Sequence, residues 1–334
     1  MSLRARRFPE LDANVFSPYR SRQRAMKRKT WDALIVGGGL AGLSAALYLA
    51  RAQNSVLVID SGKSMARWEP DVQNYLGFPT GISGKELLKR GRAQARRYGA
   101  RFTEDCVVKA KILHGTFQLR GKKNSYHGKF LLLATGIFHL PPEINGVSAC
   151  LGHSMFFCKD CDGVRARAKR IAIYGATDEA VEYALAMLRY SSQVVIVTNG
   201  KRPRWSKANS QRLSDYEIPV HAERIELAAC RGRQVRSLKF ANSNELRIDA
   251  LFTTRGDIYF NDLAKMLRAK ITDGEIVVDA GMRTSVKRLY AAGCVTPANC
   301  QMIIAAGQGA AAAQSINREL FRQSLADHSL VPVS

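Results

Sequence analysis

Two cysteines separated by two residues, Cys158-Lys-Asp-Cys161, are the part of this sequence whose residue types and spacing most directly predict chemistry. Such a pair can close a small disulfide, and a Cys-x-x-Cys turn commonly lowers the pKa of one thiol, which makes it nucleophilic at neutral pH. The neighbouring Lys159 favours the thiolate, whereas Asp160 and Asp162 oppose it. We interpret the pair as redox-active.

A structural zinc site is the competing interpretation, because His153 lies five residues before Cys158. Tetrahedral zinc takes four protein ligands, usually from two paired clusters, and the sequence holds no second Cys-x-x-Cys. We therefore predict redox chemistry at this pair and no metal site. Cys106, Cys150 and Cys230 are interpreted as small buried hydrophobic residues.

Three glycines, Gly37, Gly39 and Gly42, have the G-x-G-x-x-G spacing of a dinucleotide-binding turn between a strand and a helix. They provide a tight turn, close approach of the backbone to a pyrophosphate, and close packing of helix on strand. Asp60 ends the next apolar run, where a carboxylate can bind the ribose hydroxyls of an adenosine. This frame predicts a dinucleotide site.

A second unit of the same kind spans residues 170–198, but its glycine positions read Gly175, Thr177 and Ala180. A β-branched residue thus replaces the glycine that lets the backbone approach a pyrophosphate. The unit ends in Thr198-Asn199-Gly200, with no acid for a ribose and no basic pair there for a 2′-phosphate. We interpret it as a retained fold whose nicotinamide site has decayed. A working NADPH pocket that uses Lys201, Arg202 and Arg204 is the alternative.

The chain from Trp31 onward alternates strand-like apolar runs with helical stretches, which predicts wound α/β architecture with parallel sheet. Its 334 residues, 46% of them hydrophobic, are enough for two globular domains. No apolar run approaches the ~20 residues of a membrane-spanning helix. With few cysteines and no apolar signal-peptide core, we expect a cytoplasmic protein.

The charge is strongly basic, since 51 Lys and Arg against 28 Asp and Glu give a net charge of +23. The first thirty residues hold nine of the basic side chains and are interpreted as a solvated arm, yet the rest of the chain still carries +16. This excess of positive charge favours an acidic partner or an anionic ligand. The alternative is that proteins of the organism are basic in general. Nucleic acid is not expected, because no nucleic-acid recognition motif is present.

Taken together, the motifs resemble those of low-molecular-weight thioredoxin reductases over about residues 31–320. The resemblance rests on the glycine turn at residues 37–42, on Asn74-Tyr-Leu-Gly-Phe-Pro, on Leu133-Ala-Thr-Gly136, on the C-x-x-C-D-G at residues 158–163, and on Leu289-Tyr-Ala-Ala-Gly293 leading into Gln301. It implies an α/β fold of two Rossmann-like, FAD/NAD(P)-binding domains, the second inserted in the first. The expected parts are a basic arm (1–30), an FAD domain (31–143 and 272–334), and an inserted pyridine-nucleotide-type domain (144–271).

The resemblance also implies roles for individual residues. Cys161 would be the sulfur next to the flavin, Cys158 the interchange thiol that attacks a partner disulfide, and Asp162 the acid/base. The residues expected to bind FAD are Gly37, Gly39, Leu40, Ala41, Gly42, Asp60, Lys63, Arg67, Asn74, Val108, Thr135, Gly136, Gly293, Cys294, Gln301 and Met302.

Three departures from the family pattern concern the flavin contacts. Gly293-Cys294 stands where the family usually has Gly-Asp, and Cys300 replaces the usual basic residue before Gln301. The family's G-G-Q stretch is missing from residues 61–71, where Lys63, Arg67 or Trp68 are candidates to replace its contacts.

The degenerate second unit leads us to expect the branch of the family that does not use pyridine nucleotide. Electrons would come from an acidic protein such as ferredoxin, or through a second FAD beside Phe156, Phe157 or Trp68. NADPH is therefore not expected as the donor. The alternatives are an NADPH-dependent thioredoxin reductase and a thiol oxidase working in the reverse direction. The expected partners are a thioredoxin-like protein disulfide and a second copy of the chain in a homodimer.

Overall fold

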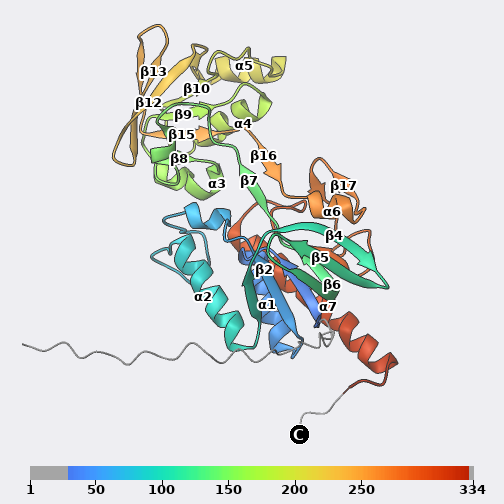
Figure 1. The fold of residues 1–334 in the computed structure, drawn as a ribbon. Helices are drawn as coiled ribbons and strands as arrows, with labels where there is room; N and C mark the ends of the chain where they lie inside the picture. The colour runs from blue at the N-terminus through green and yellow to red at the C-terminus, as the bar shows by residue number, and fades with distance from the viewer. Residues whose placement is uncertain (1–28, 331–334) are drawn as a thin grey trace, which may run out of the picture.

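The computed structural model describes residues 29–330, so nearly all of the predicted basic arm lies outside the described residues. Two α/β units are joined by a narrow connection in Figure 1, with β2 (Val56–Asp60) and α7 (Met302–Ala326) in one unit and β9 (Ile171–Tyr174) and α4 (Asp178–Met187) in the other. Within residues 29–330, no helix is long and apolar enough to span a membrane.

The first unit is built on a seven-stranded sheet. Its order is β3 (Arg101–Glu104), β2 (Val56–Asp60), β1 (Thr30–Val36), β6 (Ser125–Leu133), β5 (Thr116–Gly121) and β4 (Val107–Leu113), with β19 (Leu289–Ala291) also beside β6. Strands β3, β2, β1, β6 and β19 are parallel, whereas β4, β5 and β6 form an antiparallel ribbon. The expectation of parallel sheet is thus corrected for this ribbon. Its first turn has His114 and Gly115 at positive φ, the geometry of a two-residue hairpin.

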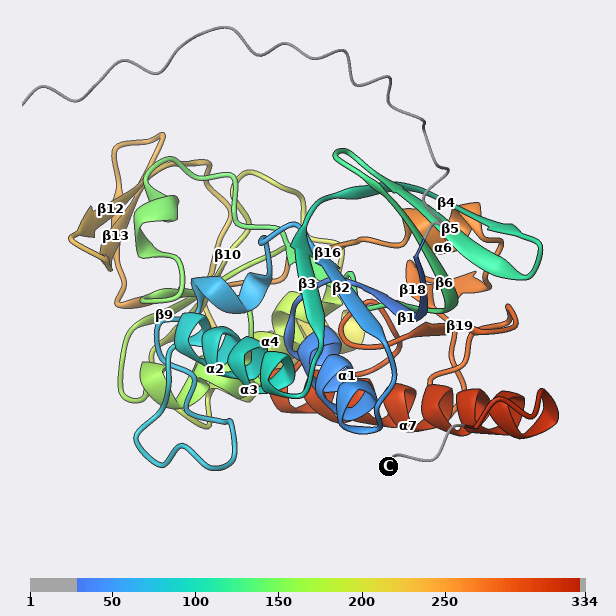
Figure 2. The ribbon, with the colours of Figure 1, turned by 60° about the horizontal axis from the view of Figure 1, so that its bottom comes forward.

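Helices α1 (Leu40–Arg51), α2 (Gly84–Arg97) and α7 (Met302–Ala326) cover one face of this sheet (Figures 1 and 2). Alternate strand residues explain the two faces, because Ala33 and Ile35 pack under the helices while Leu34 and Val36 pack on the opposite side. The C-terminal strand β19 and helix α7 thus return to the sheet that the N-terminal strand begins.

The second unit has a parallel five-stranded sheet. Its order is β11 (Val220–His221), β10 (Val194–Val197), β9 (Ile171–Tyr174), β15 (Ala250–Thr253) and β8 (Met155–Phe156). An antiparallel sheet of β12 (Ile225–Arg231), β13 (Gln234–Phe240) and β14 (Glu245–Arg247) packs beside it. Its helices are α3 (Lys159–Asp162), α4 (Asp178–Met187) and α5 (Lys207–Asp215), with short 3-10 helices at Val147–Cys150 and Gly163–Ala166. A further 3-10 helix, Met65–Trp68, belongs to the first unit, where Ala66 packs with Leu40 of α1 and Leu87 of α2.

The two units are connected by β7 (Ile137–His139) and β16 (Asp257–Tyr259), which pair in antiparallel fashion. After this ribbon come α6 (Asp262–Met266), β17 (Ile271–Thr272) and β18 (Glu275–Ile276). Leu263 and Leu267 already pack in the core of the first unit. The α/β fold class is confirmed. The exact domain limits stay a prediction; in the structure the chain passes from the first unit to the second at β7 and returns at β16.

Candidate active site

A cavity of about 1070 Å³ lies where the two units meet, which is large for a small-molecule site. Most of the residues predicted to form the site line it together: Gly37, Gly39, Leu40, Ala41, Asp60, Lys63, Asn74, Val108, Thr135, Gly136, Cys158, Cys161, Asp162, Gly293, Cys294, Gln301 and Met302. Two predicted residues are not among those that line it. Gly42 packs against the carbonyl of Gly37, and the Arg67 guanidinium donates to the carbonyl of Gly62 at 3.1 Å.

The glycine turn fits a dinucleotide pyrophosphate. Gly37 has φ +109°, and a Cβ there would lie 2.1 Å from the carbonyl oxygen of Ala134. A Cβ on Gly39 would meet nothing closer than Ser64 Oγ at 3.4 Å, so this face of the turn is open. Gly39 caps α1 without any side-chain hydrogen bond, which leaves amide groups of the first turn for an anion.

Asp60 ends β2 with its buried carboxylate on the cavity. One of its oxygens accepts from the amide of Gly62 at 3.1 Å, and the other accepts from Arg92 of α2 at 2.5 Å. A carboxylate has about four acceptor positions, so further ones are present for ribose hydroxyls. Sequence reasoning missed Arg92, because the arginine comes from a later helix and belongs to no motif.

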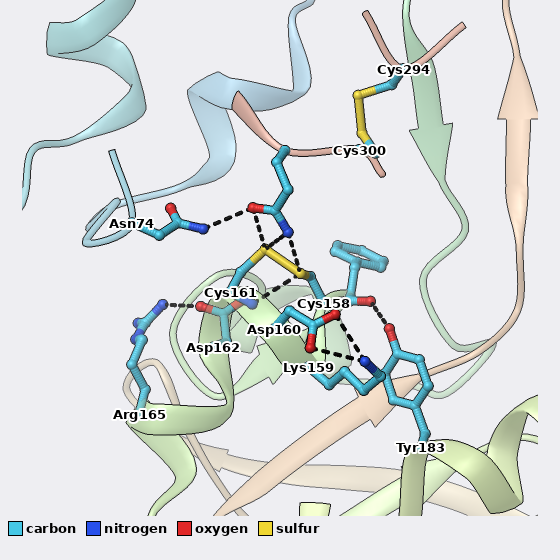
Figure 3. The surroundings of a disulfide bond; sticks show 12 residues. Asn74, Cys158, Lys159, Asp160, Cys161, Asp162, Arg165, Tyr183, Cys294 and Cys300 are labelled. Atoms are coloured by element: carbon cyan, nitrogen blue, oxygen red, sulfur yellow. Dashed lines mark hydrogen bonds and ion pairs between the residues drawn. A yellow bond between two sulfur atoms is a disulfide. The ribbon is translucent and has the colours of Figure 1, made fainter. Parts of the chain in front are cut away.

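The Cys158–Cys161 disulfide faces this cavity from the start of α3, with Cα atoms 5.3 Å apart. The sulfur of Cys158 accepts from the amide of Cys161 at 3.0 Å. Gln301 donates through Nε2 to both sulfurs, at 3.4 Å to Cys158 and 3.2 Å to Cys161, and its Oε1 accepts from Asn74 at 2.8 Å (Figure 3). Residues of the first unit therefore hold the disulfide of the second unit against the predicted flavin site.

Two carboxylic acids with raised pKa values line the cavity. Asp162 is buried and accepts from Arg165 at 2.8 Å, and burial raises its pKa despite the arginine. Glu69 also lines the cavity, and burial, reinforced by Asp162, raises its pKa to about 7, against the lowering effects of Arg165 and His139. Glu69 was not predicted, because an acid after a 3-10 turn has no sequence signature.

The aromatic residues near the site differ in position. Phe157 lines the cavity and stacks on His139, with ring centroids 5.1 Å apart. Phe156 is buried in the second unit's core, against Phe252. Trp68 is 42% exposed and packs against Phe138 in a T-shaped arrangement, with ring centroids 5.8 Å apart. Of the three residues considered for a second flavin, Phe157 alone reaches the lining of the cavity in the described part of the chain.

The interpretation of the remaining cysteines needs correction. Cys106 is exposed and lines the cavity, because it lies in the turn after β3 where its own amide binds the buried Asp105. Cys150 is buried as expected, but it is bonded to Cys230, which is partly exposed and not buried as predicted; spacing could not reveal this pairing between distant segments.

Two further observations concern the remaining cysteines and the zinc alternative. Cys294 and Cys300, which in the sequence are two separate departures from the family pattern, form a disulfide that also lines the cavity. His153, the residue behind the zinc alternative, contacts Arg233 at 3.0 Å, while Cys158 and Cys161 are bonded to each other.

Comparison with known proteins now decides the family. Residues 31–313 match the pyridine nucleotide-disulphide oxidoreductase family. The thioredoxin reductase of Treponema pallidum is 32% identical over 295 residues, covering 85% of this chain and 95% of the relative. The chain belongs to the thioredoxin reductase family.

Other members agree with this assignment. The thioredoxin reductase of Streptomyces coelicolor is 31% identical over 310 residues, which cover 89% of this chain and 95% of that protein. The crystal structure of the enzyme from Streptococcus pyogenes has the same fold, with a TM-score of 0.83 at 24% identity over 88% of this chain and 99% of that one. This family member is thus a flavin-dependent thiol-disulfide oxidoreductase, as the motifs predict.

Proposed function

We propose that this flavoprotein reduces a protein disulfide through Cys158 and Cys161 without using NADPH as its electron donor. The observation that carries the proposal is the start of α4, where a nicotinamide nucleotide would place its pyrophosphate. Thr177 stands at the N-cap, and the first turn holds Asp178 and Glu179. Two carboxylates there repel a phosphate that the helix N-terminus would otherwise attract.

The surroundings of Glu179 strengthen this argument. Partial desolvation raises the pKa of Glu179, and the charges of Asp257 and Glu182 raise it further; these two neighbouring carboxylates make the surroundings of Glu179 negative. Asp178 accepts from the amide of Ser206 and from the side chain of Asn209, which ties the turn to α5. The first turn of α4 is therefore already occupied by hydrogen bonds within the protein.

An NADPH-dependent enzyme is the second candidate, and one observation favours it. Lys201, Arg202 and Arg204 are exposed beside the same turn, where the amide of Arg204 donates to the carbonyl of Ala176 at 2.7 Å. These side chains are within the region that a 2′-phosphate would reach.

Anaerobic titration of the purified flavoprotein with NADPH and NADH separates the two candidates. We expect the visible flavin absorption to persist at micromolar nucleotide, because no productive site receives the pyrophosphate. Rapid bleaching by NADPH would defeat the proposal and establish the second candidate. A Thr177→Gly/Glu179→Thr variant that gains bleaching would support the role given to these two residues.

Within this proposal the residues of the site have distinct roles. The FAD supplies a pair of electrons to the disulfide when bound, and the glycine turn, Asp60 and residues 293–302 would hold it. The thiolate of Cys158 attacks the partner disulfide, which releases one partner thiolate and forms a mixed disulfide. Cys161 then attacks Cys158, which restores the Cys158–Cys161 bond and releases the second thiolate. Asp162 gives its proton to the first thiolate, takes the proton of the Cys161 thiol as that thiol attacks, and then passes it to the second thiolate.

The donor we propose is an acidic protein of the ferredoxin type, favoured by the net charge of +23. A second FAD against Phe157 is the other route. The ratio of released FAD to polypeptide after denaturation distinguishes them, because one FAD per chain fits a protein donor and two fit the diflavin form.

The acceptor we propose is a thioredoxin-like protein, since the relatives are thioredoxin reductases and one, from Mycobacterium leprae, is a bifunctional thioredoxin reductase/thioredoxin. Catalytic hydrogen peroxide production on adding a dithiol would instead indicate a thiol oxidase. A homodimer and a cytoplasmic location stay predictions.

A further inference from the structure

A second pair of sulfurs lies in the cofactor cavity. Cys294 and Cys300 belong to the loop between β19 and α7, and they are disulfide-bonded with Cα atoms 4.8 Å apart. Both line the same cavity as Cys158 and Cys161, and Figure 3 shows the two disulfides in one view of the site.

The first half of this loop is held without the disulfide. The amide of Gly293 donates to Gln308 at 2.8 Å, and the amide of Thr296 donates back to Gly293 at 2.9 Å. The carbonyl of Val295 accepts from Ile276 at 2.8 Å. Cys294 is therefore attached to a fixed segment that joins α7 and β18.

The second half of the loop has far fewer attachments. In the described part of the chain, the backbone of residues 297–300 makes one hydrogen bond, in which Asn299 accepts from the amide of Gln301 at 2.8 Å. Residues 297–299 are exposed. The disulfide thus ties Cys300 to the fixed half of the loop, while on the other side Gln301 caps α7 and accepts from the amide of Ala305 at 2.9 Å.

The residue directly after Cys300 is Gln301, whose side chain contacts both sulfurs of the Cys158–Cys161 pair. The Cys294–Cys300 bond therefore helps to fix the position of the Gln301 side-chain amide. The two sulfurs are also open to exchange, because both cysteines are partly exposed, whereas Cys150 is fully buried.

We propose that Cys294 and Cys300 form a second redox-active disulfide, and that its reduction releases the loop that holds Gln301 on the Cys158–Cys161 pair. The reductant is a dithiol. One thiolate attacks a sulfur of the pair and breaks the Cys294–Cys300 bond, and the second thiolate resolves the mixed disulfide. Two electrons and two protons pass to Cys294 and Cys300, and the dithiol leaves as a disulfide. The inference rests on the proposed function only for the role of Cys158 and Cys161.

Differential alkylation tests the redox part without requiring turnover. The FAD-loaded protein is equilibrated anaerobically in buffers of reduced and oxidised dithiothreitol, alkylated, and analysed by peptide mass spectrometry. We expect Cys294 and Cys300 to change from linked to alkylated in the native protein. A pair that stays linked in excess reductant, or stays alkylated in fully oxidised buffer, would overturn the proposal.

A Cys158→Ser/Cys161→Ser variant identifies the source of the dithiol. If the internal pair relays electrons, reduction of Cys294–Cys300 slows in this variant. If the external dithiol attacks directly, the rate is unchanged; both results support a redox-active second pair. Because neither measurement involves NADPH, their failure is distinct from failure of the proposed function.

Hydrogen exchange tests the structural part. On reduction we expect the amides of residues 298–301 to exchange about tenfold faster, whereas those of α4 exchange at an unchanged rate. A Cys294→Ser/Cys300→Ser variant should show the fast rate with or without reductant. Equal exchange in the linked and reduced protein would refute the release of the loop.

Discussion

At the scale of single residues, the contacts around the disulfide distinguish its two sulfurs. Cys158 accepts from the amide of Cys161 as well as from Gln301, whereas Cys161 is the closer of the two to Gln301. Hydrogen bonds to a sulfur favour its thiolate form. This arrangement suits Cys158 as the attacking thiolate of the reduced enzyme.

Replacement of Cys158 by Ser should abolish turnover with the protein acceptor, by about 10³-fold or more, because a hydroxyl does not exchange with a disulfide. The bound flavin should remain, since Cys158 belongs to the other unit. Turnover is measured with a thioredoxin and flavin content by absorption. Unchanged turnover would remove the proposed interchange role.

Replacement of Cys161 by Ser is the matched experiment. Here the flavin should no longer exchange electrons with the remaining thiol, so dithiothreitol should leave the flavin oxidised. Continued reduction of the flavin by dithiothreitol would show that a different pair carries the electrons, for which Cys294–Cys300 in the same cavity is the candidate.

Because of Glu69, the free energy of unfolding is expected to fall as the pH rises. Because burial raises its pKa from 4.5 to about 7, the folded state binds its proton more tightly than the unfolded chain. The stabilisation is complete below pH 4.5 and is lost as the pH rises to about 7. Glu69→Gln should flatten this part of the curve of unfolding free energy against pH, measured in urea. An identical slope in the variant would contradict the assignment.

At the scale of elements, the cofactor site depends on how closely α7 approaches α1. Gly309 lies in this contact, and a Cβ there would be 2.0 Å from the carbonyl oxygen of Ala41. Ala41 lines the cavity beside the glycine turn, so the approach of the two helices sets the shape of the cavity at the proposed FAD site.

Gly309→Ala should therefore destabilise the protein by about 1–3 kcal/mol and weaken FAD binding, because the helices must move apart. Gly307→Ala is the control on the same helix. Its Cβ meets nothing within 4 Å, so the change should be neutral or stabilise by up to about 1 kcal/mol. Thermal unfolding and FAD retention measure both variants; equal effects would argue against the close contact.

At the scale of the whole molecule, the net charge of +23 is the property most relevant to the proposed donor. Electrostatic steering raises the rate of encounter with an oppositely charged protein and is screened by salt. The excess does not depend on the arm, since the chain without its first thirty residues still carries +16.

With an acidic ferredoxin as donor, the rate of flavin reduction should fall about tenfold as the ionic strength rises from ~0.01 to ~0.2 M. Stopped-flow absorption measures this rate. Deletion of residues 1–30 should keep most of the salt dependence. A rate that does not respond to salt would exclude steering by the body of the protein.

Much of the fold and of the site is determined by the sequence alone, because it depends on neighbouring residues. The glycine turn, the acid that ends β2 and the Cys-x-x-Cys turn each act within a few positions of the chain. Their spacing fixes the backbone geometry that the chemistry requires, so they predict the α/β fold and the redox function.

Only the tertiary structure decided which distant groups meet. Arg92 reaches Asp60, Gln301 contacts the disulfide, and Cys294 is bonded to Cys300. Burial, which raises the pKa of Glu69, is likewise a property of the assembled units. Such contacts depend on the packing of helices and loops against the sheets, which local spacing does not specify.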